Sequence, residues 1–360
     1  MDPSKLIPVA EALPAPWWLL DFLGVLTLML HLLVINIALG GSLISLFSRL
    51  KSADAPPEAT LSGLFATKIP TSFAVGITLG VAPLLFFQVL YHHFFYTSSV
   101  LMAVFWILII PLVIIGYYGA YINARKYGKS SMLATAALTV TCLVLLYVAF
   151  AFQNNISLML QPEKWTAYFN NRSGTILSLD DPVLWPRYLH FITASVAVAA
   201  LFSALIWSLR RRKGADGADG KIRSGLRIFA VATMIQIVLG FWLLIALPKP
   251  VMMQFMGQNM TYTLFLFLGI VLALSAIMTA VLGWLYPTLL VLLGTVAVML
   301  LLRTFLRTAY LNPYFRLESL GLIPQYDVLA VFLVVFVAGL VILGFMLKWA
   351  VAAGNRKAAA

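Results

Sequence analysis

The chain has 360 residues, of which 62% are apolar and only 10% are charged, and its formal net charge is +12. Soluble domains carry about 25% charged residues, so this composition excludes a soluble globular protein. The basic residues lie between apolar segments rather than in a basic arm, which favours membrane topology signals over a nucleic-acid partner.

Apolar stretches longer than about 20 residues recur along the chain, and each is long enough to cross a bilayer as a helix. We predict an all-α polytopic bundle of nine membrane-spanning helices, which forms a single membrane domain over residues 1–360. Its parts are an N-terminal segment at 1–16, the bundle at 17–349 and a tail at 350–360. The predicted helices are Trp17–Phe47, Ala66–Phe95, Ser98–Asn123, Met132–Phe152, Val183–Leu209, Ile222–Leu247, Asn259–Trp284, Pro287–Thr308 and Tyr326–Trp349.

Two polar connections separate these helices. The first runs from Gln153 to Asp181 and contains a short amphipathic piece near Pro162–Phe169. The second, Arg210–Arg223, is rich in Lys, Arg, Gly and Asp, and we interpret it as a solvated linker.

Lysine and arginine are divided unevenly between the two sides of the predicted bundle, with sixteen on one side and eight on the other. Cytoplasmic connections carry the excess of positive charge in membrane proteins. We therefore expect an integral protein of a bacterial inner membrane, with the N-terminus outside and the C-terminus in the cytoplasm. The sixteen are Arg49, Lys51, Lys68, Arg125, Lys126, Lys129, Arg210, Arg211, Arg212, Lys213, Lys221, Arg223, Arg227, Lys348, Arg356 and Lys357, and the eight are Lys5, Lys164, Arg172, Arg187, Lys249, Arg303, Arg307 and Arg316.

The single cysteine, Cys142, lies within an apolar run. One thiol excludes an intrachain disulfide, a cysteine zinc site, an iron–sulfur cluster and covalent attachment of haem c. We expect Cys142 to be a small buried apolar residue. The N-terminus lacks a basic region, so we also expect no cleavable signal peptide.

The predicted topology places all four histidines in the outer half of the membrane. His31 lies in the first helix, His92 and His93 at the outer end of the second, and His190 near the start of the fifth. Ionisable side chains are costly in a bilayer, so they are candidates for function. Neutral imidazole is the usual axial ligand of haem iron. We interpret His31 and His190 as iron ligands. One of the pair, with His93 ahead of His92, would be a third ligand or a proton acceptor in quinol oxidation.

Small residues and arginines accompany two of these histidines. Arg187 lies one turn outward of His190, where it is placed to meet a haem propionate. Arg303 and Arg307, near the outer end of the eighth helix, are placed likewise. Small residues that leave room for a flat group are Ala38, Ser42 and Ser45 after His31, and Ala194 and Ala197 after His190. The alternative is that the histidines bond to neighbouring helices and the small residues only pack helices together.

Two other candidates have an equally plain structural explanation. Met260 belongs to a group of methionines between the sixth and seventh helices and is a further possible axial ligand, although a flexible apolar filler is the commoner role. His92 and His93 stand beside Tyr91 and Tyr96, so the alternative role for the pair is anchoring at the membrane interface.

Acidic residues are absent from the cores of the predicted helices, and Asp21 and Asp327 lie at helix ends. Proton paths across membrane proteins usually include carboxylates. This pattern argues against a proton-driven transporter and against oxygen reduction by the chain alone.

Four segments of the chain resemble helices of a known family. They are LTLMLHLLVINIALGGSLISLF around His31, FAVGITLGVAPLLFFQVLYHHFFYTSSVLMAVFW around the histidine pair, DPVLWPRYLHFITASVAVAALFSAL around His190, and KIRSGLRIFAVATMIQIVLG. Together they resemble the first, second, fifth and sixth helices of the haem-bearing subunit I of cytochrome bd quinol oxidases, over roughly the first two-thirds of the chain. The resemblance implies nine helices, an outer N-terminus and haem ligation by His31 and His190.

The chain also departs from that family. MAVFWILIIPLVIIG has no counterpart of the glutamate in the third helix near the oxygen-reducing haem, and the GRQPW motif is missing. The long quinol-binding loop is reduced to about Pro248–Gln258. Met260 is the nearest candidate for the methionine ligand of the low-spin haem, and Phe267 stands at its ungapped position. Oxygen reduction and the family's quinol site are therefore not implied.

These observations lead us to expect a b-type haem subunit that exchanges electrons between the quinone pool and a periplasmic partner. The partner would be a c-type cytochrome or another membrane subunit, and the cofactors haem b and a quinone. Two alternatives are a terminal oxidase subunit that reduces oxygen and a haem-free membrane anchor or transporter-like subunit.

Overall fold

A computed structural model of the chain describes residues 7–8, 11–51, 60–128 and 131–359. Within these residues the fold is all-α, with one isolated β-bridge between Leu13 and Leu322 and no strand. The α-helices are α1 (Trp17–Lys51), α2 (Leu61–Leu90), α3 (His92–Leu101), α4 (Ala103–Ile107), α5 (Ile109–Lys126), α6 (Ser131–Met159), α7 (Leu184–Arg211), α8 (Ala218–Ala246), α9 (Lys249–Met253), α10 (Met260–Val281), α11 (Leu285–Leu311) and α12 (Tyr326–Ala359). Three short helices of other types are η3 (Pro162–Phe169), η4 (Gln254–Gln258) and η5 (Leu317–Ser319).

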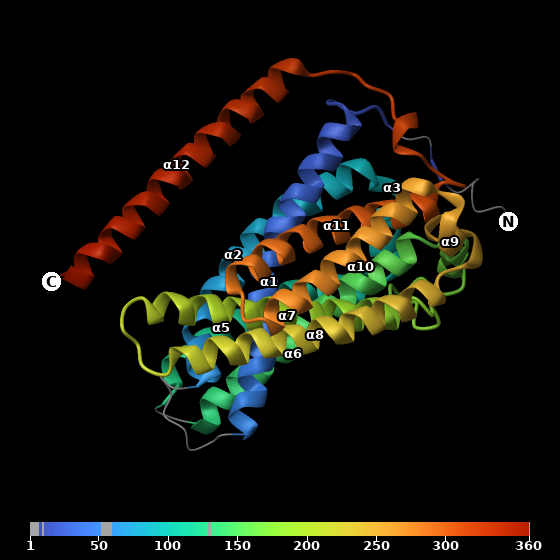
Figure 1. Cartoon of the computed structure of the whole chain (residues 1–360). Helices are drawn as coiled ribbons and strands as arrows, with labels where there is room; N and C mark the ends of the chain where they lie inside the picture. The colour runs from blue at the N-terminus through green and yellow to red at the C-terminus, as the bar shows by residue number, and fades with distance from the viewer. Residues whose placement is uncertain (1–6, 9–10, 52–59, 129–130, 360) are drawn as a thin grey trace.

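Nine helical segments of the described chain are long and apolar enough to cross a membrane, which confirms the predicted fold class. Eight of them lie side by side in a bundle, and α12 stands apart from it (Figure 1). Side chains of the span Tyr326–Met346 are almost all exposed. Most other spans also present apolar side chains outward, as helices in contact with lipid do.

The predicted third helix, Ser98–Asn123, is wrong in its boundaries, because the structure divides this region into α3, α4 and α5. The break between α3 and α4 at Met102 is stabilised by an outside segment. Ile176 N–H donates to the Leu101 carbonyl at 2.9 Å, and Val104 N–H donates to the Gly174 carbonyl at 3.0 Å. These two bonds satisfy backbone groups that the break leaves without helical partners.

Other boundaries differ from the predictions as well. Helix α6 runs to Met159, so it includes the first seven residues of the predicted connection Gln153–Asp181. Helix α2 ends at Leu90, so His92 and His93 begin α3 instead of ending the second span. Helix α8 already begins at Ala218, after Gly217 in the left-handed conformation (φ 67°), so the solvated linker is shorter than Arg210–Arg223.

The connection between α6 and α7 contains the predicted amphipathic piece, which is confirmed as the 3₁₀-helix η3. Trp165 anchors it by donating its Nε1–H to the Leu158 carbonyl at 2.9 Å. Lys164 donates to the Asp180 carboxylate at 2.7 Å, and this bond holds the pKa of Asp180 below its ordinary value. These two bonds tie η3 to the end of α6 and to the end of the connection. The segment between them contains Gly174 and Ile176, which bond to the α3–α4 break.

Close approach of α1 and α7 sets the relative depth of the two histidine-bearing helices. A Cβ atom on Gly40 would lie 2.8 Å from the Val196 nitrogen and would overlap the Ser195 carbonyl. Only glycine allows the two backbones to meet here, as small residues commonly do between membrane helices.

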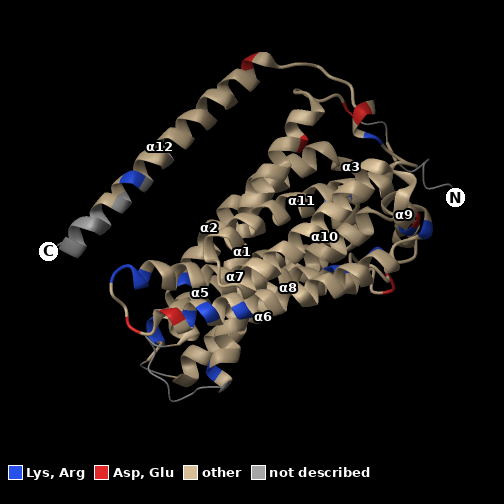
Figure 2. Cartoon of the chain, viewed as in Figure 1, with Lys and Arg blue, Asp and Glu red and all other residues tan. Residues whose placement is uncertain are grey.

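Basic residues gather at one end of the molecule, where α1, α5 and α7 end and α8 begins (Figure 2). We call this the basic end, and the opposite end, where α1 and α7 begin, the histidine end. Lys5 and Lys129 lie outside the described residues, as do the side chains of Lys51, Arg356 and Lys357. The division of charge agrees with the predicted connections, whereas the side of the membrane on which each end lies stays a prediction.

Candidate functional site

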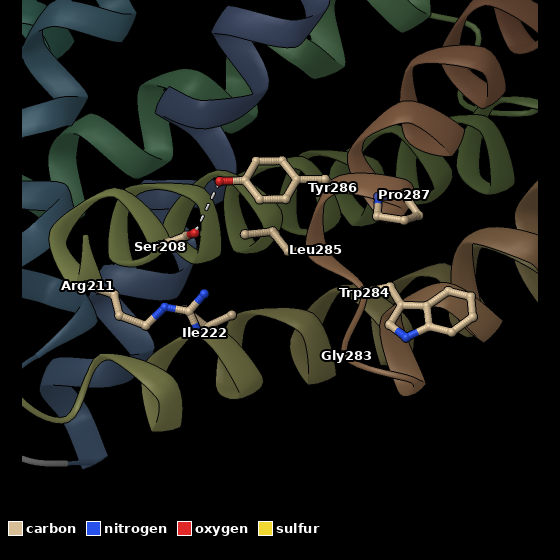
Figure 3. A pocket seen from close by; sticks show the side chains of 8 residues that line it. All are labelled: Ser208, Arg211, Ile222, Gly283, Trp284, Leu285, Tyr286 and Pro287. Carbon is tan, nitrogen blue, oxygen red and sulfur yellow. Dashed lines mark hydrogen bonds between the residues drawn. The ribbon is translucent and has the colours of Figure 1, made fainter.

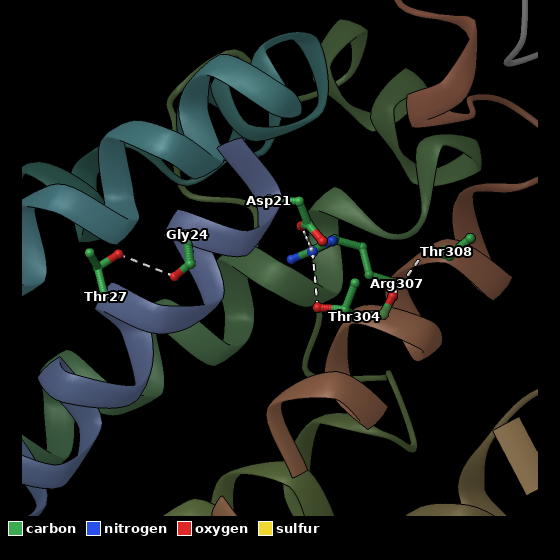
Figure 4. A network of polar contacts seen from close by, with 6 residues as sticks. All are labelled: Asp21, Gly24, Thr27, Thr304, Arg307 and Thr308. Carbon is green, nitrogen blue, oxygen red and sulfur yellow. Dashed lines mark hydrogen bonds and ion pairs between the residues drawn. The ribbon is translucent and has the colours of Figure 1, made fainter. Parts of the chain in front are cut away.

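An ion pair joins α1 to α11 at the histidine end. Arg307 Nη2 lies 3.4 Å from Asp21 Oδ1, and the two side chains are only 11% and 20% exposed (Figure 4). The guanidinium also lies over the ring of Tyr91, 4.3 Å from its centroid, and over that of Phe87 at 4.9 Å. Arg307 is therefore fixed by one carboxylate and two aromatic faces.

Arg187 reaches from the first turns of α7 to the end of α6. Its Nη2 donates to the Gln153 carbonyl at 3.1 Å and to the hydroxyl of Ser157. The buried carboxylate of Asp181 is an electrostatic neighbour, and its Oδ1 accepts from the Val183 N–H at 3.0 Å. Arg187 is thus oriented mainly by neutral oxygen atoms of the neighbouring helix.

Arg303 lies one turn before Arg307 on α11 and is partly buried. Its charged neighbours are the guanidiniums of Arg307 and Arg187, and it also acts electrostatically on His31. Within the described part of the chain, Arg303 forms neither a hydrogen bond nor an ion pair. We call Arg187, Arg303 and Arg307 the arginine cluster; its central member has like charges for neighbours and no carboxylate of its own.

His31 lies on α1 against α2. Its Nδ1 is 2.8 Å from the Gly76 carbonyl oxygen. A carbonyl only accepts, so Nδ1 carries the proton and Nε2 retains its lone pair. A Cβ atom on Gly80 would lie 2.8 Å from His31 Cε1, so the absence of a side chain there makes space for the imidazole. This is the tautomer in which a metal-ligating histidine is usually held, with Nδ1–H bonded to a carbonyl.

His190 lies on α7 against α8. A Cβ atom on Gly240 would be 3.8 Å from His190 Cε1, and the backbone of Gln236 is beside the ring. The ring is partly buried. His31 and His190 therefore lie at the same end of the molecule but against different neighbouring helices.

The contact at Gly40 allows the depths of these two histidines to be compared. Helices α1 and α7 are the first and fifth spans, so they run in the same direction. His31 precedes Gly40 by nine residues, and His190 precedes Ser195 by five. At about 1.5 Å of rise per residue, the two imidazoles differ in depth by about 6 Å.

His92 and His93 follow Tyr91, the residue whose ring Arg307 covers. Their rings are 3.9 Å apart between centroids. His92 Nε2 is buried and finds no hydrogen-bond partner among the described residues. The histidine pair thus lies next to the arginine cluster through Tyr91, an arrangement that the sequence did not predict.

Met260, the first residue of α10, is 71% exposed and faces away from the packed interior. Within the described residues no group of three or more His, Cys, Asp or Glu side chains could hold a metal ion. A haem needs only one or two axial side chains, so the lack of such a group does not exclude the predicted haem ligands.

Sequence reasoning missed the partners that orient the predicted residues. These are Asp21 and Tyr91 for Arg307, the Gly76 carbonyl for His31, and Ser157 for Arg187. Asp21 lies 286 residues from Arg307 in the chain. The available signal was an acid just inside one span and an arginine near the end of another, two charges that a membrane protein tends to pair.

Comparison of the chain with protein-family models, with curated proteins and with solved structures finds no match. The resemblance to cytochrome bd subunit I is therefore still a prediction.

Proposed function

We propose that the protein is a membrane electron-transfer subunit that binds haem b at the histidine end. In this proposal it exchanges electrons between the quinone pool and a periplasmic c-type cytochrome or another membrane subunit. The observation that carries the proposal is the arginine cluster beside His31, in which Arg303 has no counter-charge among the described residues.

The arginine cluster supports an anionic ligand. Even a partly buried guanidinium is stabilised by charge-assisted hydrogen bonds to a carboxylate or to neutral oxygen atoms. Arg307 has Asp21, and Arg187 has oxygen atoms of α6, whereas Arg303 lacks both kinds of partner. Carboxylates such as haem propionates fit the planar fork of arginine in a bidentate manner. We assign Arg303 the role of the first propionate partner, with Arg187 and Arg307 on either side.

The imidazoles are suited to bind iron, which is the second property that we propose for this anionic ligand. His31 presents Nε2 with its lone pair, because Gly76 holds the opposite nitrogen in the protonated state. His190 supplies a further imidazole about 6 Å away in depth, on the α8 side. Bound haem would supply a one-electron carrier, and the protein would supply its position and its electrostatic surroundings.

In this proposal a quinol would donate its electrons at the histidine end. His92 Nε2 is a buried nitrogen atom without a partner in the described chain, next to His93. A neutral imidazole nitrogen of this kind accepts a proton from a quinol hydroxyl. If the histidine end faces outward, the proton then leaves to the outer side without crossing the membrane.

Haem content tests the proposal directly. We expect the purified full-length protein to contain non-covalent haem b, visible in oxidised and reduced spectra and in a pyridine haemochrome assay. A well-folded, monodisperse preparation expressed with ample haem supply and free of haem would contradict the proposal and favour the haem-free anchor. Sustained, cyanide-sensitive oxygen consumption with a quinol as sole donor would favour the terminal oxidase.

The orientation of the bundle is a separate prediction. In a Cys142→Ala background, we expect an impermeant maleimide to label Arg172→Cys in intact spheroplasts. It should label Asp216→Cys only after permeabilisation. Both positions are exposed, so accessibility of the side chain does not bias the comparison. The reverse pattern would place the histidine end at the cytoplasmic side and exclude a periplasmic electron acceptor.

A further inference from the structure

A pocket of about 380 Å³ opens at the basic end, far along α7 from the arginine cluster. Ser208 and Arg211 of α7, Ile222 of α8, and Trp284, Leu285 and Tyr286 around the turn from α10 to α11 line it (Figure 3). We propose that this pocket binds the phosphate group of an anionic phospholipid. The site is independent of the proposed haem and of its ligands.

Polar groups in and beside the pocket suit a phosphate. The hydroxyls of Ser208 and Tyr286 are 3.5 Å apart, and both can donate to an anion. Arg212 Nη2 donates to the Tyr286 hydroxyl oxygen at 2.7 Å, which leaves the hydroxyl proton directed elsewhere. Arg211 uses Nη1 to bind Asp219 at 2.6 Å, and its guanidinium has further N–H groups for a second anion.

The charge around the pocket is strongly positive. Residues 210–227 contain seven basic and two acidic side chains, and the basic ones form the densest cluster of blue in Figure 2. Two of them are held by an aromatic ring: Arg210 lies 4.6 Å and Lys221 4.1 Å from the centroid of Trp207. A concave surface with this much positive charge attracts an anion from a distance of about one Debye length.

The surroundings favour a lipid over a soluble phosphate compound. The pocket lies where the spans α7 and α10 end and α8 and α11 begin, at the level of a membrane interface. Trp284 and Tyr286 are 56% and 49% exposed there, as interfacial aromatic residues are. Ile222, Leu285 and Pro287 give the pocket an apolar wall for the glycerol and upper acyl carbons. Basic pockets between membrane helices recognise anionic headgroups in this way.

Binding by the full-length protein in neutral detergent tests the proposal. Phosphatidylglycerol, phosphatidylcholine and inorganic phosphate are titrated separately, and lipid adducts are counted by native mass spectrometry. We expect saturable binding of phosphatidylglycerol and weaker binding of phosphatidylcholine. We expect Arg211→Gln to weaken phosphatidylglycerol binding about five-fold, the factor that one cation contributes near an anionic surface. We expect Tyr286→Phe, which removes one hydroxyl donor from the pocket, to weaken this binding as well.

Arg125→Gln is the matched control, because Arg125 is an exposed arginine at the same end of the molecule but outside the pocket. Equal weakening by Arg125→Gln and Arg211→Gln would show diffuse charge attraction and overturn the proposal. If inorganic phosphate binds as tightly as the lipid, the ligand of the pocket is a soluble anion and the lipid proposal is overturned. If the unfolding temperature of Arg211→Gln falls, Arg211→Lys takes its place in the experiment. Arg211→Lys keeps the charge and loses the planar fork, so it should bind the lipid less tightly than the wild-type protein does.

Discussion

Replacing His31 with alanine is expected to lower the affinity of the purified protein for haem by more than about 100-fold. Loss of an outer-shell partner alone costs a metal site 10–100-fold in affinity, and this change would remove the ligand itself. The Gly76 carbonyl would also lose the N–H that it accepts. Haem-to-protein ratio and the reduced spectrum measure the effect, and added imidazole should restore part of the bound haem in His31→Gly.

Asn36→Ala is the matched control for this prediction. Asn36 lies on the same helix and is 6% exposed, and its Oδ1 is buried without a partner in the described chain. The substitution therefore removes a buried polar group of α1 without touching a proposed ligand, and haem content should stay at the wild-type level. A folded His31→Ala protein with wild-type haem content would remove His31 from the proposed ligands.

Much of the fold could be predicted from the sequence, because a bilayer permits few solutions. Backbone groups in lipid must be paired within the segment, so a long apolar run is a helix. The break at Met102 could not be predicted in this way. The run from Ser98 to Asn123 carries no charged residue, and the bonds that stabilise the break come from Gly174 and Ile176 in a distant connection.

The candidate site was predictable residue by residue but not as an arrangement. Hydropathy places Arg187 and Arg303 within about two turns of one end of their helices and His31 in the corresponding half of its helix, and the structure has them there. The direction in which each side chain points depends on helix rotation, which the neighbouring helices determine. The contact of His31 with Gly76 and the isolation of Arg303 among other arginines arise only from that packing.

The structure also separates two histidines that the sequence treated alike. His31 lies against α2 and His190 against α8, so the two imidazoles belong to different helix pairs. If both bind iron, this arrangement favours two haem groups over one haem ligated from both sides. A haem-to-protein ratio of two, falling to one in each single variant, would support that arrangement.

The second large effect is expected for the buried pair between α1 and α11. Replacing Asp21 with asparagine should destabilise the haem-free protein by about 3–5 kcal/mol, the usual cost of removing one partner of a buried pair. The change keeps the size of the side chain and removes only its charge. Arg307 would then lose the carboxylate that lies 3.4 Å from it, while the positive charge of Arg303 stays nearby. Unfolding followed by tryptophan fluorescence in detergent measures the loss.

The exposed pair Arg211–Asp219 provides the comparison that decides whether burial causes this effect. It is shorter than the buried pair, at 2.6 Å against 3.4 Å, but its side chains are 52% and 62% exposed. Water screens such a pair, so Asp219→Asn should cost no more than about 1 kcal/mol. The double variant Asp21→Asn/Arg307→Leu should recover most of the stability that Asp21→Asn loses, because it leaves no unmatched charge at that position. Two results would contradict this prediction: an equal loss of unfolding free energy in Asp21→Asn and Asp219→Asn, or a double variant that is less stable than Asp21→Asn. Either result would show that the carboxylate of Asp21 does not stabilise Arg307, which would then be held by the rings of Tyr91 and Phe87.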